Sequence, residues 1–228
     1  MKLLTIQTAL FPLESIARPD LEYSEINRTM GTVFDAMPTI IELPENAPNE
    51  IPLVQAHSSD GRYKLNISRS RIDCIIGLDI DVAAVPHETF ESNKQLIMKF
   101  VNASIARFDV FRIGVVITMF EKRKNNVYSV YEKYIKLPFS ERCMEVNLRY
   151  NETRQIKGMV INNIRTVEAA NLHIERHDGT TEDQTGVSIQ IDVNNQPNPR
   201  TKLTLERITS ILDCAREHLN PETVKGMI

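Results

Sequence analysis

The side chains best suited to chemistry in this sequence are histidines, carboxylates and clustered cations. Among the histidines, His173 and His177 have the spacing of two metal ligands on one face of a helix. The surrounding residues instead predict a strand end followed by a polar loop, where side chains four residues apart do not converge on one ion. We therefore predict no metal site and interpret both as solvated loop residues.

Acid–base chemistry at carboxylates is a second alternative. His57 lies in a predicted hairpin, and together with Asp73 it could act as a general base. Asp79 and Asp81 lie on one side of an extended segment, where paired carboxylates can hold a divalent metal or share a proton. Asp192 ends another predicted strand. Solvated strand-end residues are the simpler interpretation in each case, so no catalytic residue is assigned.

Two basic clusters are the candidate binding residues. Arg69 and Arg71 form the first, and Lys122, Arg123 and Lys124 form the second. Clustered cations can contact the phosphates of a nucleic acid. The chain, however, has a formal net charge of −3, contains no Trp and is only 6% aromatic. Nucleic acid is therefore a less favoured partner than protein.

The sequence lacks the common signatures of nucleotide-binding and hydrolytic enzymes. It contains no P-loop, GxGxxG, GxSxG or HExxH motif. With 8 glycines in 228 residues, it also offers little material for a backbone cradle around phosphates. We expect no cofactor, and we consider an enzyme less favoured than a binding protein.

A hairpin around Asp60-Gly61 is the clearest element that must position these residues. Apolar and polar residues alternate on both sides of this dipeptide, which is typical of a type I′ turn because both central residues need positive φ. The apolar positions then change parity between Ile67 and Ile72. This change predicts a β-bulge or sharp bend at residues 69–71.

Other segments show helical or strand periodicity. Helices are predicted where apolar residues recur every three or four positions, over residues 21–37 (with Gly31 inside), 88–108 and a last helix capped by Thr201 or Thr204. A short helix or loop is predicted over 127–135. Strands are predicted over residues 2–17, 111–120, 144–153, 156–174 and 187–193.

The order of these elements predicts an α+β protein with two similar halves. Residues 1–108 and residues 109–228 would each have the order β-α-β-β-β-α, with antiparallel strands and the helices packed on one face of the sheet. No residue-level repeat accompanies this order. One continuous domain is the alternative to two.

Composition and cysteine usage indicate a chain with a real core in a reducing compartment. Hydrophobic residues make up 42% of the sequence. The three cysteines, Cys74, Cys143 and Cys214, have no pairing pattern, and we expect buried free thiols at Cys74 and Cys214. The N-terminal apolar run resembles a signal peptide, but polar residues and Pro12 interrupt it, and we interpret it as a strand. No apolar stretch approaches the roughly 20 residues that cross a bilayer. We expect a cytoplasmic protein without a membrane partner.

Three short motifs together resemble a known family. They are Val54-Gln55 leading to Ser59-Asp60-Gly61, then Arg71-Ile72-Asp73, then Arg112-Ile113-Gly114-Val115, and Ile191-Asp192 would match an Asp that ends a strand before the last helix in that family. Their order and spacing are similar to those of a sporadically distributed family of uncharacterised bacterial proteins of about this size. The resemblance spans roughly residues 50–195 and implies a bacterial source. It implies no activity and assigns no functional residue.

These observations lead to one functional hypothesis with two alternatives. We expect a non-enzymatic protein-binding or assembly subunit, such as a chaperone-like or accessory or defence-system component, that acts through sheet surfaces as a homo-oligomer or in a complex. The first alternative is an enzyme with its site between the two halves, and the second is a nucleic-acid-binding module.

Overall fold

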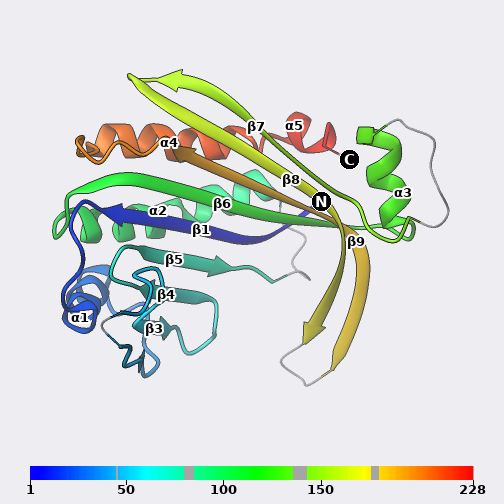
Figure 1. Ribbon diagram of the computed structural model, residues 1–228. Helices are drawn as coiled ribbons and strands as arrows, with labels where there is room; N and C mark the ends of the chain where they lie inside the picture. Colours follow the sequence, from blue (N-terminus) through cyan, green and yellow to red (C-terminus); the bar gives the residue numbers. More distant parts are fainter. Residues whose placement is uncertain (45, 80–84, 136–142, 176–179, 228) are drawn as a thin grey trace.

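Nine strands form one continuous antiparallel sheet in the computed structural model, which describes residues 1–44, 46–79, 85–135, 143–175 and 180–227 (Figure 1). The strand order is β2-β3-β4-β5-β1-β6-β9-β8-β7. The strands are β1 (Lys2–Pro12), β2 (Thr39–Ile40), β3 (Val54–His57), β4 (Tyr63–Ile67), β5 (Ile72–Gly77), β6 (Val110–Lys122), β7 (Asn147–Ile156), β8 (Met159–Glu175) and β9 (Thr181–Asn195). The α+β class with an antiparallel sheet is therefore confirmed.

The helices α1, α2 and α4 lie behind the sheet in Figure 1 and cover the same face. The helices are α1 (Pro19–Met30), α2 (Pro86–Ile105), α3 (Asn126–Val130), which continues as a π-helical turn over Tyr131–Ile135, α4 (Leu205–Glu217) and α5 (Pro221–Lys225). Proline occupies the first turn of α1 and α2, where its missing N–H costs nothing. At the start of α4 the Thr204 side chain accepts a hydrogen bond from the Arg207 N–H, which confirms one of the two predicted caps.

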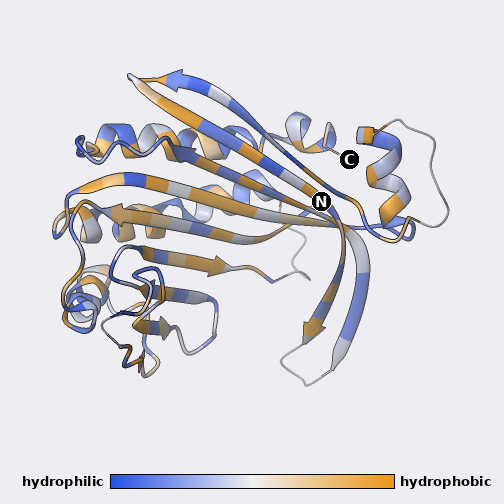
Figure 2. Cartoon of the chain, viewed as in Figure 1, coloured by the Kyte–Doolittle hydropathy of each residue, from blue (hydrophilic) through white to orange (hydrophobic). Residues whose placement is uncertain are grey.

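The core lies between this face and the helices. Leu10 pairs with Ile72 on one side and with Ile113 on the other, Ile161 of β8 lies on the same face, and all four are fully buried. Figure 2 shows hydrophobic residues concentrated along β1, β5 and β6, whereas β7 is largely hydrophilic. Burying an aliphatic side chain of this size contributes about 1.5–3 kcal/mol, so the central strands hold the sheet together. None of the helices formed by the described residues is long and apolar enough to cross a membrane.

The helix boundaries differ from the prediction at α1. This helix ends at Met30, because Gly31 adopts the left-handed conformation with φ of 86° and forms the C-cap rather than an interior residue. Beyond it, Phe34 folds back into the core, held by Asn27. The Asn27 side chain donates to the Phe34 carbonyl at 2.9 Å and accepts from the Phe34 N–H at 3.0 Å. The apolar spacing that suggested a longer helix therefore includes a residue that reaches the core from a loop.

The predicted hairpin is present, with one correction to its turn. β3 and β4 pair around residues 58–62, but only Gly61 has positive φ, so the turn is not type I′. The change of parity after Ile67 comes from a sharp bend, one of the two predicted alternatives, which forms the turn of a second hairpin without a bulge. There the Ser68 N–H donates to the Arg71 carbonyl at 2.9 Å, and β4 and β5 pair directly from Ile67 and Ile72.

The chain is divided evenly between the two sides of the sheet. Residues 1–108 supply the strands from β2 to β1, and residues 109–228 supply those from β6 to β7. The two sets meet where β1 and β6 pair antiparallel at the centre. The predicted boundary at residue 108 therefore falls between α2 and β6, while the sheet itself runs without interruption.

Candidate functional site

The face of the sheet opposite α1, α2 and α4 is left uncovered by these helices, and we call it the open face. Its residues are found by following the register from strand to strand. One row consists of Gln55, Asn66, Asp73, Ala9, Gly114, Asn194, Asn162 and Thr153. The next row consists of His57, Lys64, Ile75, Gln7, Val116, Asp192, Ile164 and Asn151. Most of these side chains can form hydrogen bonds, which is the composition of a surface that contacts water or a ligand.

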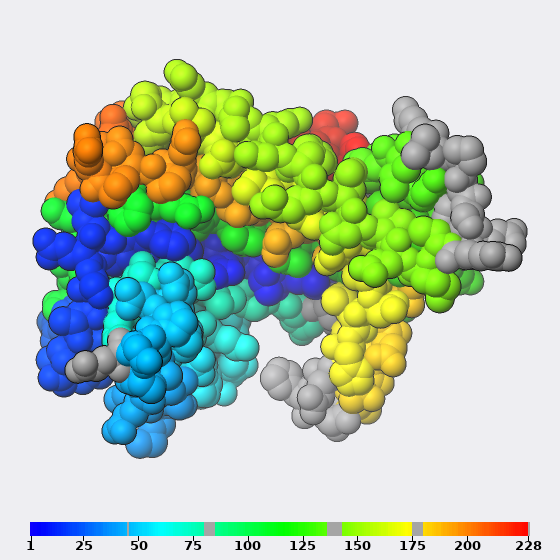
Figure 3. Space-filling model, viewed as in Figure 1, coloured from blue at the N-terminus to red at the C-terminus, as the bar shows by residue number. Residues whose placement is uncertain are grey.

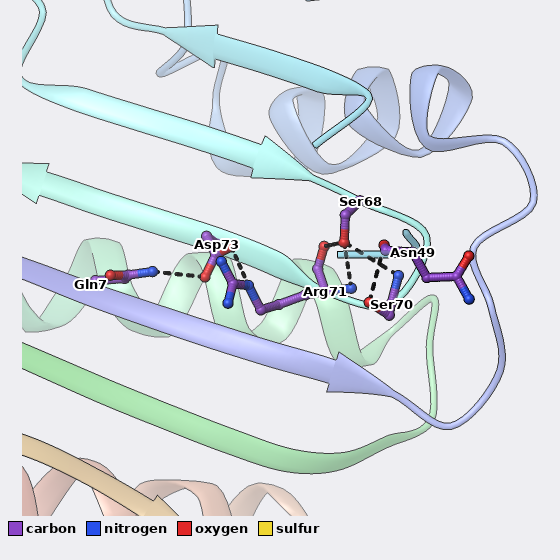
Figure 4. A network of polar contacts seen from close by, with 6 residues as sticks. All are labelled: Gln7, Asn49, Ser68, Ser70, Arg71 and Asp73. Atoms are coloured by element: carbon purple, nitrogen blue, oxygen red, sulfur yellow. Dashed lines mark hydrogen bonds and ion pairs between the residues drawn. The ribbon is translucent and has the colours of Figure 1, made fainter. Parts of the chain in front are cut away.

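Asp73 is the most buried charge on the open face, at 3% exposure. Its carboxylate accepts a hydrogen bond from the Gln7 side chain at 3.0 Å and from the Arg71 guanidinium at 2.7 Å (Figure 4). Figure 4 also shows the adjoining turn, in which the Ser68 hydroxyl accepts from the N–H groups of Ser70 and Arg71. Because a buried carboxylate requires such partners, this network fixes the position of Arg71 at the rim of the face.

Phe11 extends this network toward the centre of the sheet. The Arg71 guanidinium lies 6.0 Å from the centre of its ring, and that of Arg112 lies 4.9 Å from it. Two cations against one ring form a cation–π arrangement, typically stabilising by about 0.5–1 kcal/mol when partly exposed. Arg112 opens the Arg-Ile-Gly-Val motif found in the sequence, but nothing in that motif indicates that it joins Arg71.

A line of side-chain amides crosses the other half of the open face. Asn151 donates to Asn162 at 3.1 Å, Asn162 donates to Asn194 at 3.0 Å, and Asn194 donates to the Asp192 carboxylate at 2.9 Å. We call these four residues the amide ladder. Each amide donates toward Asp192, so the ladder brings hydrogen-bond donors to that charge from the edge strand β7.

Between Asp73 and the amide ladder, the face has a floor of small residues. Ala9 and Gly114 lie opposite each other on β1 and β6. Figure 3 shows the molecule hollowed between β3–β5 on one side and the outer part of β8 and β9 on the other. This hollow lies toward the far end of β6, because Gly186 at the base of that outer part pairs with Lys122, eight residues along β6 from Gly114. A ligand that crosses the floor would therefore meet backbone and hydrogen-bonding side chains together.

The outer part of β8 and β9 forms the far wall of this hollow. Residues 171–175 and 181–185 pair with each other but with no other described strand, and we call them the ribbon. The register places half-buried Leu172 and Ile174 on its open-face side, opposite Gln184 and Glu182. On the other side, His173 and Asp183 form an exposed pair at 2.7 Å. The ribbon thus presents apolar side chains toward the open face.

Gly186 lies where the ribbon joins the sheet. An added Cβ would lie 2.8 Å from Cε2 of Phe120 and closer still to Phe120 Cζ and the Glu121 carbonyl oxygen. Phe120 is itself 2% exposed on the open-face side of β6. The ring therefore occupies the space that a side chain at residue 186 would need, and packs against the backbone at the base of the ribbon.

The two predicted basic clusters lie at opposite ends of the sheet. Arg71 is level with the start of β6, on the far side of β1, and Lys122 ends β6, so about 33 Å separates the two along the strand direction. Arg71, Lys122 and Arg123 each form an ion pair, with Asp73, Glu182 and Glu121 respectively. Arg69 is half-buried and Lys124 is exposed. These positions do not form a contiguous basic surface.

The predicted acid–base pairs are not brought together where the structure describes them. His57 lies on β3 and Asp73 on β5, two strand spacings and two residues apart, or about 12 Å. Asp73 and Asp192 are three strand spacings and two residues apart, or about 16 Å. Asp79 is exposed, and its predicted partner Asp81 lies outside the described residues.

The histidine pair also fails to meet within the described chain, since His177 lies outside it. His173 instead pairs with Asp183 across the ribbon. In the described ranges, no group of three or more His, Cys, Asp or Glu side chains could hold a metal ion.

A second polar cluster, missed in the sequence, lies on the helix-covered face near the end of α4. His218 Nε2 is 3.2 Å from the Asn163 side-chain oxygen. Burial lowers the pKa of His218, and the nearby guanidinium groups of Arg165 and Arg154 lower it further. Arg154 also pairs with Glu217 at 2.9 Å. The alternation of residues along β7 and β8 places Arg154 and Arg165 on the core face. Because cations on that face need polar partners, their position was the one signal in the sequence that could have indicated this cluster.

Comparison with known proteins adds no family to this description. No protein-family model matches the chain, and no curated protein matches it at a significant level.

Proposed function

We propose that this protein is a non-enzymatic protein-binding or assembly subunit that holds a protein partner against the open face. The observation that carries the proposal is the open face itself: a sheet surface opposite the main helices, rich in hydrogen-bonding side chains and walled by the ribbon. A polypeptide laid across Ala9 and Gly114 would reach Asp73 and Arg71 on one side and the amide ladder on the other. A partner that also extends along β6 toward Lys122 would meet the apolar side of the ribbon, which supplies contacts that such a partner needs for affinity.

The arrangement of charge favours protein over nucleic acid as the partner. Nucleic-acid binding requires protein cations that are free to neutralise phosphates and so release the counterions condensed on the nucleic acid. Arg71, Lys122 and Arg123 are instead neutralised by carboxylates, and the two clusters lie far apart. A mixed surface of amides, carboxylates and a few cations is typical of protein interfaces.

The wide separation of the carboxylates supports a binding role rather than an enzymatic one. A shared proton or a shared metal needs two carboxylates in contact. Asp73 and Asp192 are instead each held by hydrogen bonds to neutral or cationic side chains on their own side of the sheet. Both have structural partners that account for their charge.

We also propose that the halves 1–108 and 109–228 are repeats of one β-α-β-β-β-α unit. Supporting this, the order β1-α1-β2-β3-β4-β5-α2 is followed by β6-α3-β7-β8-β9-α4, and the two orders match apart from the two-residue strand β2. An Ile-Asp dipeptide lies on the strand next to the central pair in each half, at Asp73 and Asp192. The open face would then be a composite surface to which both repeats contribute. The resemblance to the bacterial family and a cytoplasmic location, which the three free thiols support, remain part of this proposal.

The test uses one exposed residue on each side of the molecule. Gln190 is exposed on the open face, and Gln95 is exposed on α2. The variants Gln190→Arg and Gln95→Arg make the same chemical change and differ only in location. A random-peptide display library and labelled single-stranded oligonucleotides serve as probes against the wild type and both variants.

We expect the wild type to enrich peptides whose binding is lost in Gln190→Arg and kept in Gln95→Arg. Oligonucleotides should bind neither variant nor the wild type at physiological salt. Peptide binding that survives Gln190→Arg, or oligonucleotide binding with a steep salt dependence, would contradict the proposal.

A further inference from the structure

The outer edge of β7 is the longest unpaired strand edge among the described residues. β7 ends the sheet, contains ten residues and pairs with β8 without a shift in register. The opposite edge strand, β2, has only two residues. Exposed edges are normally protected by shortness, Pro, Lys or a bulge. β7 is long and has no Pro, Lys or bulge, and the charges of Arg149, Glu152 and Arg154 are its remaining protection, so a ten-residue backbone edge is open to pairing.

The hydrogen-bonding pattern shows which β7 residues face outward. The Ala169 N–H donates to the Val146 carbonyl, so Val146 directs its backbone groups toward β8. In an antiparallel pair this direction alternates from residue to residue. The five odd-numbered residues of the strand, namely Asn147, Arg149, Asn151, Thr153 and Gln155, therefore direct their N–H and C=O groups away from the sheet.

We propose that β7 pairs antiparallel with β7 of a second copy of this chain, joining two sheets into one. A two-fold pairing must centre on a residue that lies opposite itself, because paired residues share a face. Two such registers pair nine residues, one centred on Asn151 and one on Glu152. The Glu152 register places like charges directly opposite each other, which is destabilising. The Asn151 register opposes no like charges.

The charge pattern of β7 allows it to pair with a second copy of itself. In the Asn151 register, Arg149 lies opposite Thr153 of the second copy, and Glu152 lies opposite its Tyr150, so each charge faces a neutral side chain. The five outward residues of each strand then form about ten backbone hydrogen bonds. The edge of β7 can therefore be satisfied in full by a second copy.

The amide ladder supplies an independent argument for the same register. It begins at exposed Asn151, whose side-chain nitrogen donates to Asn162. In the paired dimer the two Asn151 side chains lie opposite each other on the open face. The ladder would then continue across the two-fold axis into the second sheet, as stacked amides do in other extended sheets. The two open faces become one surface.

This inference goes beyond the proposed function, since a monomer could also bind a partner on its open face. The two can fail separately, because Gln190→Arg leaves the edge of β7 unchanged. Light scattering should give twice the 26.1 kDa mass of one chain for the wild type. Thr153→Pro removes an N–H that points away from the sheet, leaves the backbone hydrogen bonds between β7 and β8 intact, and should give a monomer. Thr153→Ala keeps that N–H and should remain a dimer.

Cysteine cross-linking tests the register without a change to the backbone. Residues opposite each other in a hydrogen-bonded pair have Cα atoms about 5.5 Å apart, which a disulfide can span. In a Cys143→Ser background, Asn151→Cys should give a covalent dimer on mild oxidation. Gln155→Cys is equally exposed but would lie about 27 Å from its copy, and should stay uncross-linked. A monomeric wild type, no cross-link at residue 151, or equal cross-linking at both positions would overturn the proposal.

Discussion

The substitution Gly186→Ala should destabilise the base of the ribbon because its methyl group has no room. The new Cβ would lie 2.8 Å from Phe120 Cε2, whereas carbon atoms in contact are about 3.5–4.0 Å apart. The backbone conformation is one that alanine adopts without strain, so the clash alone sets the cost. β9 must therefore move away from β6 by close to 1 Å.

This movement would break the contacts at the end of the pair. The hydrogen bond from the Arg123 N–H to the Thr185 carbonyl, now 3.0 Å, would be lost. Overpacking costs about 1–3 kcal/mol, and a lost backbone hydrogen bond adds about 1 kcal/mol. We therefore expect a decrease of about 3 kcal/mol in the free energy of unfolding, which lowers Tm by about 6–12 °C for a chain of this length.

Urea denaturation followed by circular dichroism measures this decrease, and Gly114→Ala is the matched control. Gly114 lies on the neighbouring strand, where an added Cβ would meet its nearest atom, the Asn194 Cβ, at 3.7 Å. That is ordinary contact, so we expect a change below about 0.5 kcal/mol. Combining Gly186→Ala with Phe120→Leu should recover part of the loss, because the ring clash is removed while the Glu121 carbonyl remains. A Gly186→Ala protein as stable as Gly114→Ala would refute this reasoning.

Three further predictions follow from buried polar groups. His218 has a lowered pKa in the folded chain, so the unfolded chain binds a proton at this residue first as the pH falls, and the free energy of unfolding should decrease below about pH 6.5. Urea midpoints measured at pH 7.5 and 5.5 should show this decrease for the wild type and a smaller one for His218→Gln. Burial raises the pKa of Cys74 to about 12 and also raises the pKa of Cys214, so a thiol reagent should modify only Cys143 in the native wild type. The reagent should modify no thiol in native Cys143→Ser, and all three thiols of the wild type in urea. Asn27→Ala should cost about 2–4 kcal/mol in chemical denaturation, because the N–H and C=O of the following loop both lose a buried partner.

The sequence predicts those parts of the fold that depend on local periodicity. The alternation around Asp60-Gly61 and the apolar spacing of α2 and α4 each arise within one element, and these elements are present. The turns were predicted less well. Their geometry depends on a few φ values and on side-chain bonds such as that of Ser68, which several sequences can satisfy.

The ribbon could not be predicted from periodicity. The last strand was expected over residues 187–193, but β9 begins at Thr181. Residues 181–185 are polar, and they are extended because they pair with β8 rather than because one face is buried. A strand that is stabilised by its partner alone leaves no apolar alternation in its own sequence.

The open face shows the same limit more clearly. Gln7 and Asp73 are 66 residues apart in sequence, and they meet only because β5 pairs with β1. The motifs containing Asp73 and Asp192 were recognised, but their partners were not. Strand order decides those partners, and strand order is not encoded in any one segment.

Asn151 connects the two surfaces proposed for this protein. It begins the amide ladder of the open face and also lies at the proposed two-fold axis on β7. If the β7 edges of two copies pair, a substitution in β7 that blocks pairing leaves the amide ladder of each chain facing solvent at Asn151. A ligand that spans both open faces would then lose affinity in Thr153→Pro but not in Thr153→Ala. If the open face acts within one chain, both variants should bind the selected peptides equally. Peptide affinity measured in these two variants therefore distinguishes a composite binding surface from two separate ones.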